Sequence, residues 1–206
     1  MPWPTVRHRP KSRDDEVLRS YPYRSACPST AWADLIDNAT RELYFGGYTS
    51  YFLWTQVPAL PETLRRKADS GCRIRFLLGD PDGAVTRQRE EIEDVALAVS
   101  TRIRTTLEQL ARIEDVDGVE ARFSAPADAI NHVSLSVFRF DDEALVTPHL
   151  ARLAGHDSPL IHLRRHGDGG VFSRFVEHGE ELWSRGVPMT GAPHARAHNS
   201  GQSEPP

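Results

Sequence analysis

Apolar residues recur three and four positions apart in four parts of the chain, and this spacing predicts amphipathic helices. Ser29 or Thr30 can cap the first helix. Gly71 can end the second, because glycine readily takes the left-handed conformation that closes a helix. The third segment is long, and we expect one helix there with at most one break. The expected helices cover residues 29–39, 60–70, 85–114 and 171–185.

Short apolar runs that end at Gly, Pro or Asp lie between these helices and predict strands. Strands and helices alternate in the first half of the chain, whereas three or four strands follow the long helix. This order predicts an α/β fold in which a parallel or mixed sheet is flanked by helices. In such sheets ligands bind at the carboxyl ends of the strands. The expected strands cover residues 43–45, 72–79, 119–124, 134–140, 143–149 and 158–165.

The two ends of the chain lack this patterning. Residues 1–25 are rich in Pro, Arg and Asp, and we expect them to form a flexible N-terminal arm. Residues 188–206 contain few apolar residues, and we expect a disordered tail. Residues 26–187 then form one α/β domain, which is long enough to bury a core of its own.

The composition excludes some classes of protein and limits the residues that an anion site could use. The net charge of −4 means that the 206-residue chain is no general electrostatic attractor of nucleic acid. No apolar run reaches the ~20 residues of a membrane span. Cys27 and Cys72 have no metal-type spacing. We therefore expect a cytoplasmic protein with reduced thiols, no membrane contact and no metal or other cofactor. Only Lys11 and Lys67 are lysine among the 25 Lys and Arg residues, so an anion site must use arginine or histidine.

The stretch SLSVFRFDDEALVTPH, residues 134–149, reads as a strand, a tight acidic turn and a second strand. Ser134 and Ser136 share one face of the first strand, and Asp141 and Asp142 close it. Buried strands are usually apolar throughout, or they alternate apolar and polar residues. The stretch is therefore either an ordinary hairpin or a catalytic strand that has lost its reactive residues.

The same stretch resembles the second half of a phospholipase D-type repeat, whose signature is His, one residue, Lys, four residues and Asp. In this chain the Asp falls on Asp141, while Ser134 and Ser136 occupy the His and Lys positions. The body of the chain also resembles a family of unknown function from high-GC bacteria, which is classed as phospholipase D-like and often follows a helix-turn-helix regulator domain. The resemblance implies a single phospholipase D-like repeat with a degenerate phosphodiesterase site. The shared segments are LRRKADSGCRIRFLLGDPD, VFRFDDEALVTPH, LIHLRR and FSRFVEHGEELW.

The two serines change the chemistry that the resemblance implies. In the phospholipase D family a histidine attacks phosphorus, and the paired lysine neutralises the phosphoryl oxygens. A serine hydroxyl is a far weaker acid than imidazolium, and Ser136 brings no positive charge. His132 lies two residues before Ser134, and we expect it on the same strand face, where a slipped alignment could use it as the nucleophile. Its spacing to Asp141 is two residues too long, so a packing role is the alternative.

The loop GDPDGAVTRQREE follows an expected strand and opens an expected helix. Asp80 and Asp82 could face a cleft, and Arg87 beside a helix N-terminus could bind an anion. In the alternative interpretation, the loop is a Pro-Asp-Gly turn whose carboxylates cap the helix and whose arginines are solvated.

Further candidate ligands lie on the last strands. His162 and Arg164 share one strand face, where they either line a polar cleft or protect an edge strand from aggregation. His149 and Arg139 complete the set, and a contact between Arg139 and Asp141 is the structural alternative for that arginine. We expect one group of residues to converge on a cleft at the carboxyl edge of the sheet, namely Ser134, Ser136, Asp141, His162 and Arg164.

These residues support two functions of different classes. The first is a non-catalytic, ligand-sensing or regulatory domain whose degenerate cleft binds a nucleotide or another small phosphorylated ligand. The second is an enzyme of phosphoryl or nucleotidyl transfer or hydrolysis that uses His132, His149 or His162 as a base.

The resemblance also bears on partners. It implies a link to transcriptional regulation, and it allows a homodimer, because single-repeat members of the phospholipase D family complete their site by dimerising. Residues 1–25 are too short for a helix-turn-helix, although Arg7, Arg9, Lys11 and Arg13 could touch phosphates. We therefore expect no direct binding to DNA.

Overall fold

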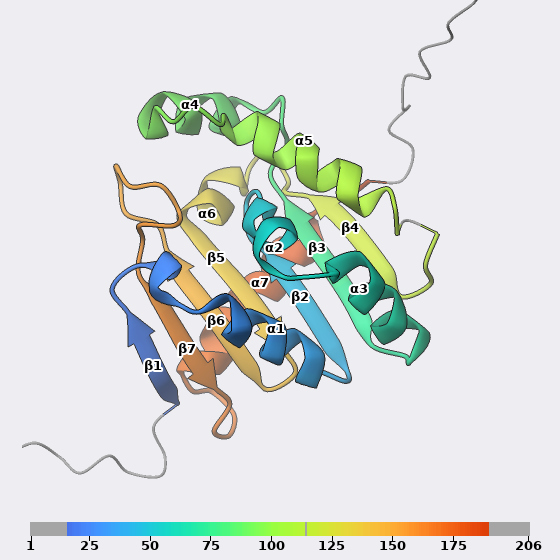
Figure 1. Ribbon diagram of the computed structural model, residues 1–206. Coiled ribbons are helices and arrows are strands. Elements are labelled where there is room, and N and C mark those ends of the chain that lie inside the picture. Colours follow the sequence, from blue (N-terminus) through green and yellow to red (C-terminus); the bar gives the residue numbers. More distant parts are fainter. Residues whose placement is uncertain (1–15, 114, 190–206) are drawn as a thin grey trace, which may run out of the picture.

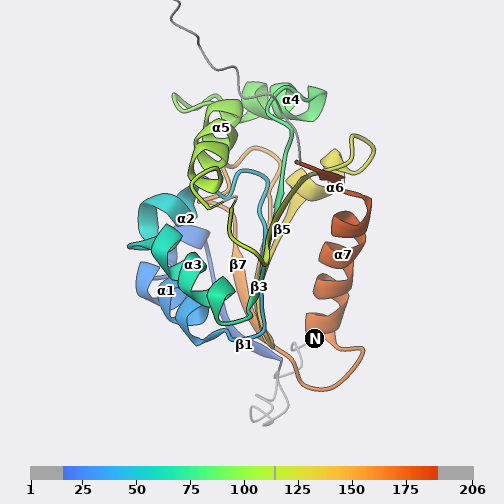
Figure 2. The same ribbon diagram turned by 90° about the vertical axis from the view of Figure 1, so that its right-hand side faces the viewer.

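Residues 16–113 and 115–189 are described by this computed structural model, and they form one eight-stranded sheet with helices on both faces (Figures 1 and 2). The strands are β1 (Val17–Tyr21), β2 (Glu42–Gly46), β3 (Arg73–Leu78), β4 (Val119–Phe123), β5 (Leu135–Phe140), β6 (Glu143–Pro148), β7 (Leu160–Arg164) and β8 (Val187–Pro188). Their order in the sheet is β1-β7-β6-β5-β2-β3-β4-β8. β3 is parallel to β2 and β4, and the other neighbouring pairs are antiparallel. The predicted α/β fold with a mixed sheet flanked by helices is confirmed.

Helices cover the two faces of the sheet unequally. They are α1 (Ser29–Asn38), α2 (Tyr51–Gln56), α3 (Leu60–Asp69), α4 (Ala84–Glu93), α5 (Val99–Leu110), α6 (Ala129–Ser134) and α7 (Val171–Arg185), with a 3-10 turn, η1 (Arg24–Ala26), before α1. Figure 2 shows α1, α2, α3 and α5 on one face and α7 on the other. Within the described residues, none of these helices combines the length and the apolar character needed to cross a membrane.

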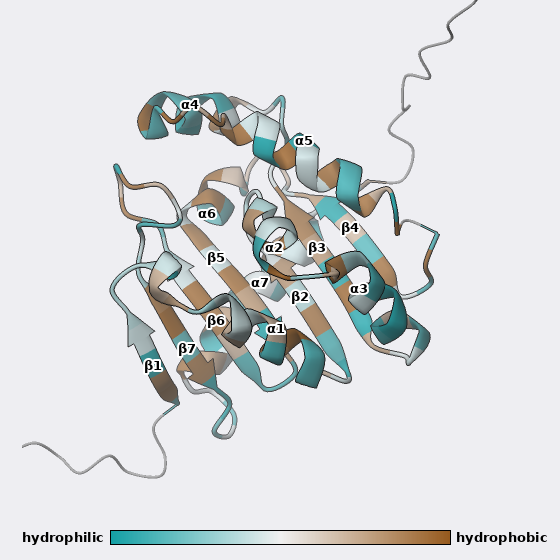
Figure 3. Ribbon diagram, viewed as in Figure 1, coloured by the Kyte–Doolittle hydropathy of each residue, from teal (hydrophilic) through white to brown (hydrophobic). Residues whose placement is uncertain are grey.

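Apolar side chains fill the space between the sheet and the helices, and the central strands are correspondingly apolar (Figure 3). On the α1 face, the buried ring of Trp32 packs edge-on against Phe52 and Phe138, with centroid distances of 4.7 and 5.1 Å. On the opposite face, Phe172 and Trp183 of α7 belong to a second buried cluster. The centre of the sheet is therefore buried on both sides, which rigidly supports whatever lies at the strand ends.

Several strands begin or end at the same side of the sheet, which is called the carboxyl edge below. β2 and β3 are parallel and both end there. Because β5 is antiparallel to β2, it begins at this edge, and β6 ends at it. The chain turns sharply after β2, where a Cβ on Gly47 would come within 2.6 Å of the Phe138 ring. Glycine at this position lets the backbone approach the start of β5 closely.

The middle of the chain follows the predicted elements in part. The expected helix over 85–114 has the one break that was allowed for: it is divided into α4 and α5 after Asp94, which adopts a left-handed conformation with a φ of 44°. The segment before β5 is the short helix α6, so the strand begins at Leu135 and not at Ser134. His132 therefore lies on a helix, and the prediction that it shares a strand face with the two serines is wrong.

The ends of the chain carry two further strands. β1 pairs with β7 in the region 1–25 that we expected to be a flexible arm. Its residues are mostly exposed, so its sequence lacks the alternation that predicts a half-buried strand. β8 pairs with β4 and is the edge strand at the other end of the strand order from β1. It lies where we expected the tail to begin. Residues 1–15 and 190–206 lie outside the described residues.

Candidate functional site

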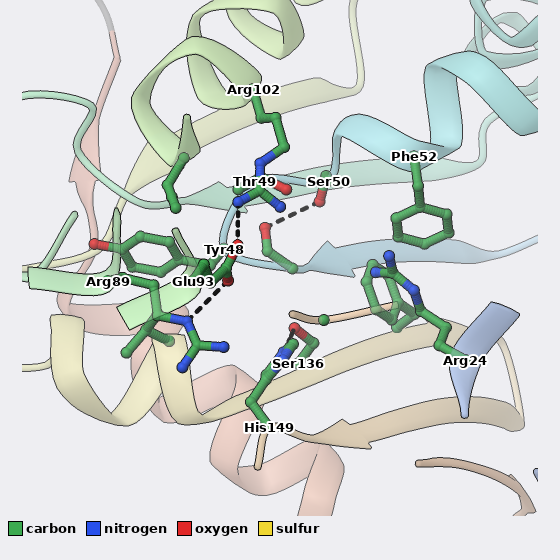
Figure 4. Close-up of a pocket in the computed structure, with 15 residues that line it drawn as sticks. Arg24, Tyr48, Thr49, Ser50, Phe52, Arg89, Glu93, Arg102, Ser136 and His149 are labelled. Carbon is green, nitrogen blue, oxygen red and sulfur yellow. Dashed lines mark hydrogen bonds and ion pairs between the residues drawn. The ribbon is translucent and has the colours of Figure 1, made fainter. Parts of the chain in front are cut away.

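A pocket opens at the carboxyl edge, between the loop after β2, the helices α4 and α5, the start of β5 and the segment after β6 (Figure 4). Its enclosed part has a volume of about 40 Å³, which is room for about three water molecules. The polar side chains that line it are Arg24, Thr49, Ser50, Arg89, Glu93, Arg102, Ser136 and His149, and Tyr48, Phe52 and Phe138 add aromatic surface.

Positive charge is in excess in this pocket. Arg24, Arg89 and Arg102 bring three guanidinium groups, whereas Glu93 is the one carboxylate among the described residues that line it. Arg89 donates from Nε to Glu93 at 2.8 Å, and Arg102 pairs with the second oxygen of the same carboxylate. Three positive charges and one negative charge leave two positive charges unbalanced.

Local structure explains how these side chains meet. Arg89 and Glu93 are four residues apart on α4, so they lie on the same helix face. After the break at Asp94, α5 folds back against α4, and Glu90 accepts a hydrogen bond from the backbone N–H of Ser100 at 2.6 Å. This contact holds the start of α5, and with it Arg102, over the pocket.

Arg24 comes from a distant part of the chain. Its backbone N–H donates to the carbonyl of Ser158 at 2.7 Å, which fixes the turn η1 beside the pocket. Its guanidinium lies over the Phe52 ring, 3.9 Å from the centroid. Burial and the neighbouring charge of Arg102 lower the pKa of Arg24 to about 10. Within the described chain, no carboxylate or carbonyl accepts a hydrogen bond from this guanidinium.

Other donors in the pocket are also unused. The Nε of Arg102 is buried and has no hydrogen-bond acceptor among the described residues. A buried donor without a partner costs free energy, and an anion that supplied an acceptor would remove that cost. An anion in the pocket could supply the acceptor that the Nε of Arg102 lacks.

Ser136 and His149 form a hydrogen-bonded pair on the floor of the pocket. Ser136 lies on β5 and His149 directly follows β6, and the two strands are paired in a register that brings them together. The distance from Ser136 Oγ to His149 Nε2 is 2.8 Å. Burial, and then the nearby charges of Arg24 and Arg89, lower the pKa of His149 to about 4. The imidazole is therefore neutral at pH 7.

The structure places His132 and Ser134 away from the pocket lining. His132 is buried on α6, where its Nδ1 is hydrogen-bonded to Ser124 and its ring packs edge-on against Tyr48. Burial lowers the pKa of His132 to about 3. Ser134 is exposed, and its hydroxyl donates to the carbonyl of Ile130 at 2.6 Å. These contacts match the packing alternative for His132.

Asp141 lies at the opposite end of β5, about 17 Å from Ser136 at the usual rise of a strand. It accepts hydrogen bonds from the backbone N–H groups of Thr40, Arg41 and Glu42 at 2.8, 2.9 and 2.8 Å. Burial alone would raise the pKa of Asp141, but these amides hold it below its usual range. The carboxylate ties the β5–β6 turn to the start of β2.

His162 and Arg164 also lie away from the carboxyl edge, toward the opposite ends of the strands, which are called the far edge below. Both pair with Glu143, with Nε2 of His162 at 2.6 Å and Nη2 of Arg164 at 2.9 Å from its oxygens. The expected convergence of Ser136, Asp141, His162 and Arg164 on one cleft is therefore wrong. The reason is the hairpin itself: β5 and β6 run the full height of the sheet, so residues at its tip cannot reach the carboxyl edge.

The remaining candidates have structural partners. Arg139 faces α7 and pairs with Glu42 at 2.6 Å, and its Nε donates to the carbonyl of Asp141. In the GDPD loop, Asp80 accepts from the backbone N–H of Asp82 at 2.9 Å. Asp82 pairs with Arg104 at 2.6 Å, and Arg87 donates to the carbonyl of Asp82. The loop lies beside the pocket, but these three side chains do not line it.

Several pocket residues escaped the sequence analysis as site residues, among them Arg24, Arg102 and Glu93. Arg24 lies in the segment that we expected to be a flexible arm, and Arg102 lies within an amphipathic helix, where an arginine usually faces solvent. Glu93 ends α4 and looks like any surface carboxylate. The scarcity of lysine did predict that an anion site would use arginine, but it could not say which arginines.

No family model matches the chain, and no curated protein matches its sequence. Among solved structures the chain is similar to TrmBL2, an archaeal chromatin protein whose structure shows a novel mode of DNA binding. The TM-score is 0.51 at 14% identity, over 86% of this chain and 56% of TrmBL2. This chain and TrmBL2 share a fold. This chain therefore spans little more than half of the TrmBL2 chain.

Two further solved structures are similar. One is Nuc from Salmonella typhimurium, a phospholipase D family member, with a TM-score of 0.41 at 11% identity over 77% of this chain and 88% of Nuc. The other is NucT from Helicobacter pylori, with a TM-score of 0.49 at 9% identity over 82% of this chain and 96% of NucT. With TM-scores below 0.5, these two matches carry no argument about activity.

The match to TrmBL2 corrects one expectation about partners. We expected no direct binding to DNA, because residues 1–25 are too short for a helix-turn-helix. TrmBL2 has the same fold as the described body of this chain and binds DNA. The absence of a helix-turn-helix is therefore no ground for excluding DNA, and that prediction is wrong.

Proposed function

We propose that the carboxyl-edge pocket binds the phosphoryl group of a small phosphorylated ligand, such as a nucleotide, and that the domain acts as a non-catalytic sensor. The observation that carries this proposal is the excess of guanidinium groups: Arg24, Arg89 and Arg102 line the pocket, and its one carboxylate among the described residues, Glu93, pairs with Arg89 and Arg102. Planar guanidinium forks match phosphate oxygens and bind them through two parallel hydrogen bonds.

The size and the donors of the pocket support the same ligand class. An enclosed volume of about 40 Å³ suits one phosphoryl group, and the remainder of a nucleotide would lie outside the mouth. Arg24 and the Nε of Arg102 offer donors that the described residues do not use. Tyr48 and Phe52 provide apolar walls beside them.

The absence of the usual reactive residues supports a sensor over a phosphodiesterase. Ser134 and Ser136 stand where the phospholipase D-type signature has histidine and lysine. Ser134 is also exposed and outside the pocket, so it cannot serve as a nucleophile there. Binding without turnover is the function that these residues favour, and the family resemblance links such a sensor to transcriptional regulation.

A thermal-shift screen of nucleotides and sugar phosphates tests the proposal. We expect at least one phosphorylated compound to raise the melting temperature of the wild type and to have no effect on Arg24→Gln. The matched control is Arg164→Gln, because Arg164 lies at the far edge of the sheet and pairs with Glu143. If no phosphorylated compound shifts the wild type, the proposal is wrong.

The Ser136–His149 pair favours a second candidate function, phosphoryl transfer or hydrolysis. Ser136 Oγ would attack phosphorus while neutral His149 takes its proton through the 2.8 Å hydrogen bond. The P–O bond to the leaving group would break, the leaving oxygen would take that proton from His149, and water would then hydrolyse the phosphoserine. Hydrolysis of bis-nitrophenyl phosphate distinguishes the two functions. Turnover that disappears in both Ser136→Ala and His149→Ala would establish the enzyme and refute the sensor.

DNA is a further source of phosphate groups, since TrmBL2, which shares this fold over 56% of its chain, binds DNA. A gel-shift titration with duplex DNA, at several salt concentrations, tests whether this chain does so. Binding through arginine–phosphate contacts weakens steeply with salt, in proportion to the number of phosphates contacted. If Arg24→Gln reduces the salt dependence, the pocket takes part in the contact.

A further inference from the structure

We propose that the pocket selects phosphate monoesters in their dianionic form over phosphate diesters, a preference that rests on the proposed phosphate-binding function. The ligand would be a terminal phosphoryl group, such as that of a nucleoside monophosphate or a sugar phosphate, and not an internal phosphate of a chain. Three independent features of the pocket point to this class: its charge, its donors and its room.

The charge of the pocket matches a dianion. Arg24, Arg89 and Arg102 carry three positive charges, and Glu93 carries one negative charge, so two positive charges remain. A phosphate monoester carries nearly two negative charges at pH 7, because its second pKa is about 6. A diester carries one negative charge at every pH of interest. The diester would leave one guanidinium uncompensated in a partly buried place, which is costly.

The hydrogen-bonding groups of the pocket are mostly donors. The Arg24 guanidinium and the Nε of Arg102 can both donate, whereas the hydroxyl of Ser136 is already paired with His149. The acceptor oxygens of Glu93 are already engaged by Arg89 and Arg102. The three terminal oxygens of a monoester dianion accept hydrogen bonds and donate none. A diester has two such oxygens, so it offers fewer acceptor sites to these donors.

The volume of the pocket suits a phosphate group that carries a single substituent. The enclosed volume is about 40 Å³, and its floor is made of the buried side chains of Ser136 and Phe138. A monoester can place its three terminal oxygens inside and direct its one substituent to the mouth. A diester has a second substituent, which would have to displace part of this buried floor or keep the phosphorus out of the pocket.

The pH dependence of binding can separate the ligand's ionisation from that of the protein. His149 is faced by Arg24 from η1, Arg89 and Glu93 from α4, and Arg102 from α5; buried His132 of α6 is also near. Burial and the arginines lower the pKa of His149 to about 4, so this imidazole stays neutral between pH 5 and 8. A monoester changes charge in this range, and a diester does not.

Calorimetric titration of the full chain with methyl phosphate and dimethyl phosphate, at pH 7.5 and pH 5.0, tests the proposal. At pH 7.5 we expect methyl phosphate to bind at least tenfold more tightly. Lowering the pH to 5.0 reduces its dianionic fraction to about a tenth, so its affinity should fall about five- to tenfold. The affinity of dimethyl phosphate should change less than twofold, and it reports any protonation of the protein itself.

Two variants locate the selectivity. Arg24→Gln should weaken methyl phosphate more than dimethyl phosphate and so reduce their ratio, whereas Arg164→Gln should leave the ratio unchanged. Equal affinity for the two ligands in the wild type would overturn monoester selection while leaving phosphate binding intact. Binding of neither ligand would refute the proposed function. Displacement of methyl phosphate by duplex DNA without terminal phosphates would overturn the monoester preference in favour of an internal phosphate.

Discussion

Two clusters of arginine and glutamate lie on this fold, and they differ in whether their charges balance. The balanced cluster consists of Arg75, Arg139, Glu42 and Glu180, between the sheet and α7: two positive and two negative charges. The pocket cluster consists of Arg24, Arg89, Arg102 and Glu93 at the carboxyl edge, with three positive charges and one negative charge. Both clusters are rich in arginine, but the pocket cluster has a net charge of plus two, whereas the balanced cluster has none.

The balanced cluster satisfies its own charges. The side chain of Arg75 is 1% exposed and donates to Glu180 at 2.7 Å, and it also pairs with Glu42. Its guanidinium lies 5.3 Å and 5.2 Å from the ring centroids of Tyr44 and Trp183. Burial would raise the pKa of Glu180, but the hydrogen bonds from Arg75 hold that pKa below its usual range. These ion pairs hold α7 on the sheet, and the Nε of Arg75 is the one nitrogen of the cluster that is buried without an acceptor among the described residues.

On our proposal, the unbalanced charge of the pocket cluster is what distinguishes it from the balanced cluster as a ligand site. Substituting one arginine in each cluster should therefore have opposite consequences. In the balanced cluster the loss should appear in the free energy of unfolding. In the pocket cluster it should appear in ligand affinity, with the free energy of unfolding almost unchanged.

The largest effect is expected for Arg75→Met. Removing the guanidinium leaves Glu42 and Glu180 facing each other in a partly buried place, which should lower the free energy of unfolding by about 3 kcal/mol. Urea denaturation measures the change. The paired substitution Arg75→Met with Glu180→Leu should recover part of the loss. A loss below about 1 kcal/mol would show that the balanced cluster does not stabilise the fold.

Arg24→Gln is the matched change in the pocket cluster. Loss of one charge-assisted, two-pronged contact should weaken a phosphorylated ligand about ten- to a hundredfold. The free energy of unfolding should change by no more than about 0.5 kcal/mol, because the substitution also relieves repulsion from Arg102. Calorimetry and urea denaturation on the same sample measure the two quantities. Arg24→Lys should recover only part of the affinity, since a point charge cannot replace the fork.

An effect that is confined to acid is expected from His149. Its pKa in the folded state, about 4, is below the ordinary value of about 6.5, so the unfolded chain binds this proton more readily. The contribution of the neutral imidazole to stability is therefore full above pH 6.5 and is lost as the pH falls toward 4. In that window the loss is about 1.4 kcal/mol per pH unit.

His149→Gln should therefore flatten the fall in the free energy of unfolding between pH 6 and pH 4, as measured by denaturation at several pH values. Saturating phosphate should also flatten it in the wild type, because a bound anion beside the imidazole raises its pKa. Equal slopes in the wild type and the variant would mean that His149 is not buried among the arginines as described.

The pattern of apolar residues predicted the central strands and most helices, because β2, β3 and β5 are buried on both faces. It did not predict β1, which is an exposed edge strand, or the short helix α6. For the site, the sequence identified Ser136 and His149 but also Asp141, His162 and Arg164, which lie at the far edge. A sequence motif specifies how far apart residues lie along one strand. A pocket is instead lined by residues from separate helices and strands whose ends meet at the same edge of the sheet.

The smallest effect is expected from Asp82→Asn in the GDPD loop. Its ion pair with Arg104 is exposed, with 78% and 49% of the two side chains accessible, and such pairs contribute about 0–1 kcal/mol. Asp80 and Arg87 serve the turn itself, and none of the three lines the pocket. The variant should therefore unfold within about 0.5 kcal/mol of the wild type and bind a phosphorylated ligand with less than a twofold change. A tenfold loss of affinity in Asp82→Asn would show instead that the ligand extends over this loop, which would place the anion-binding function partly outside the pocket cluster.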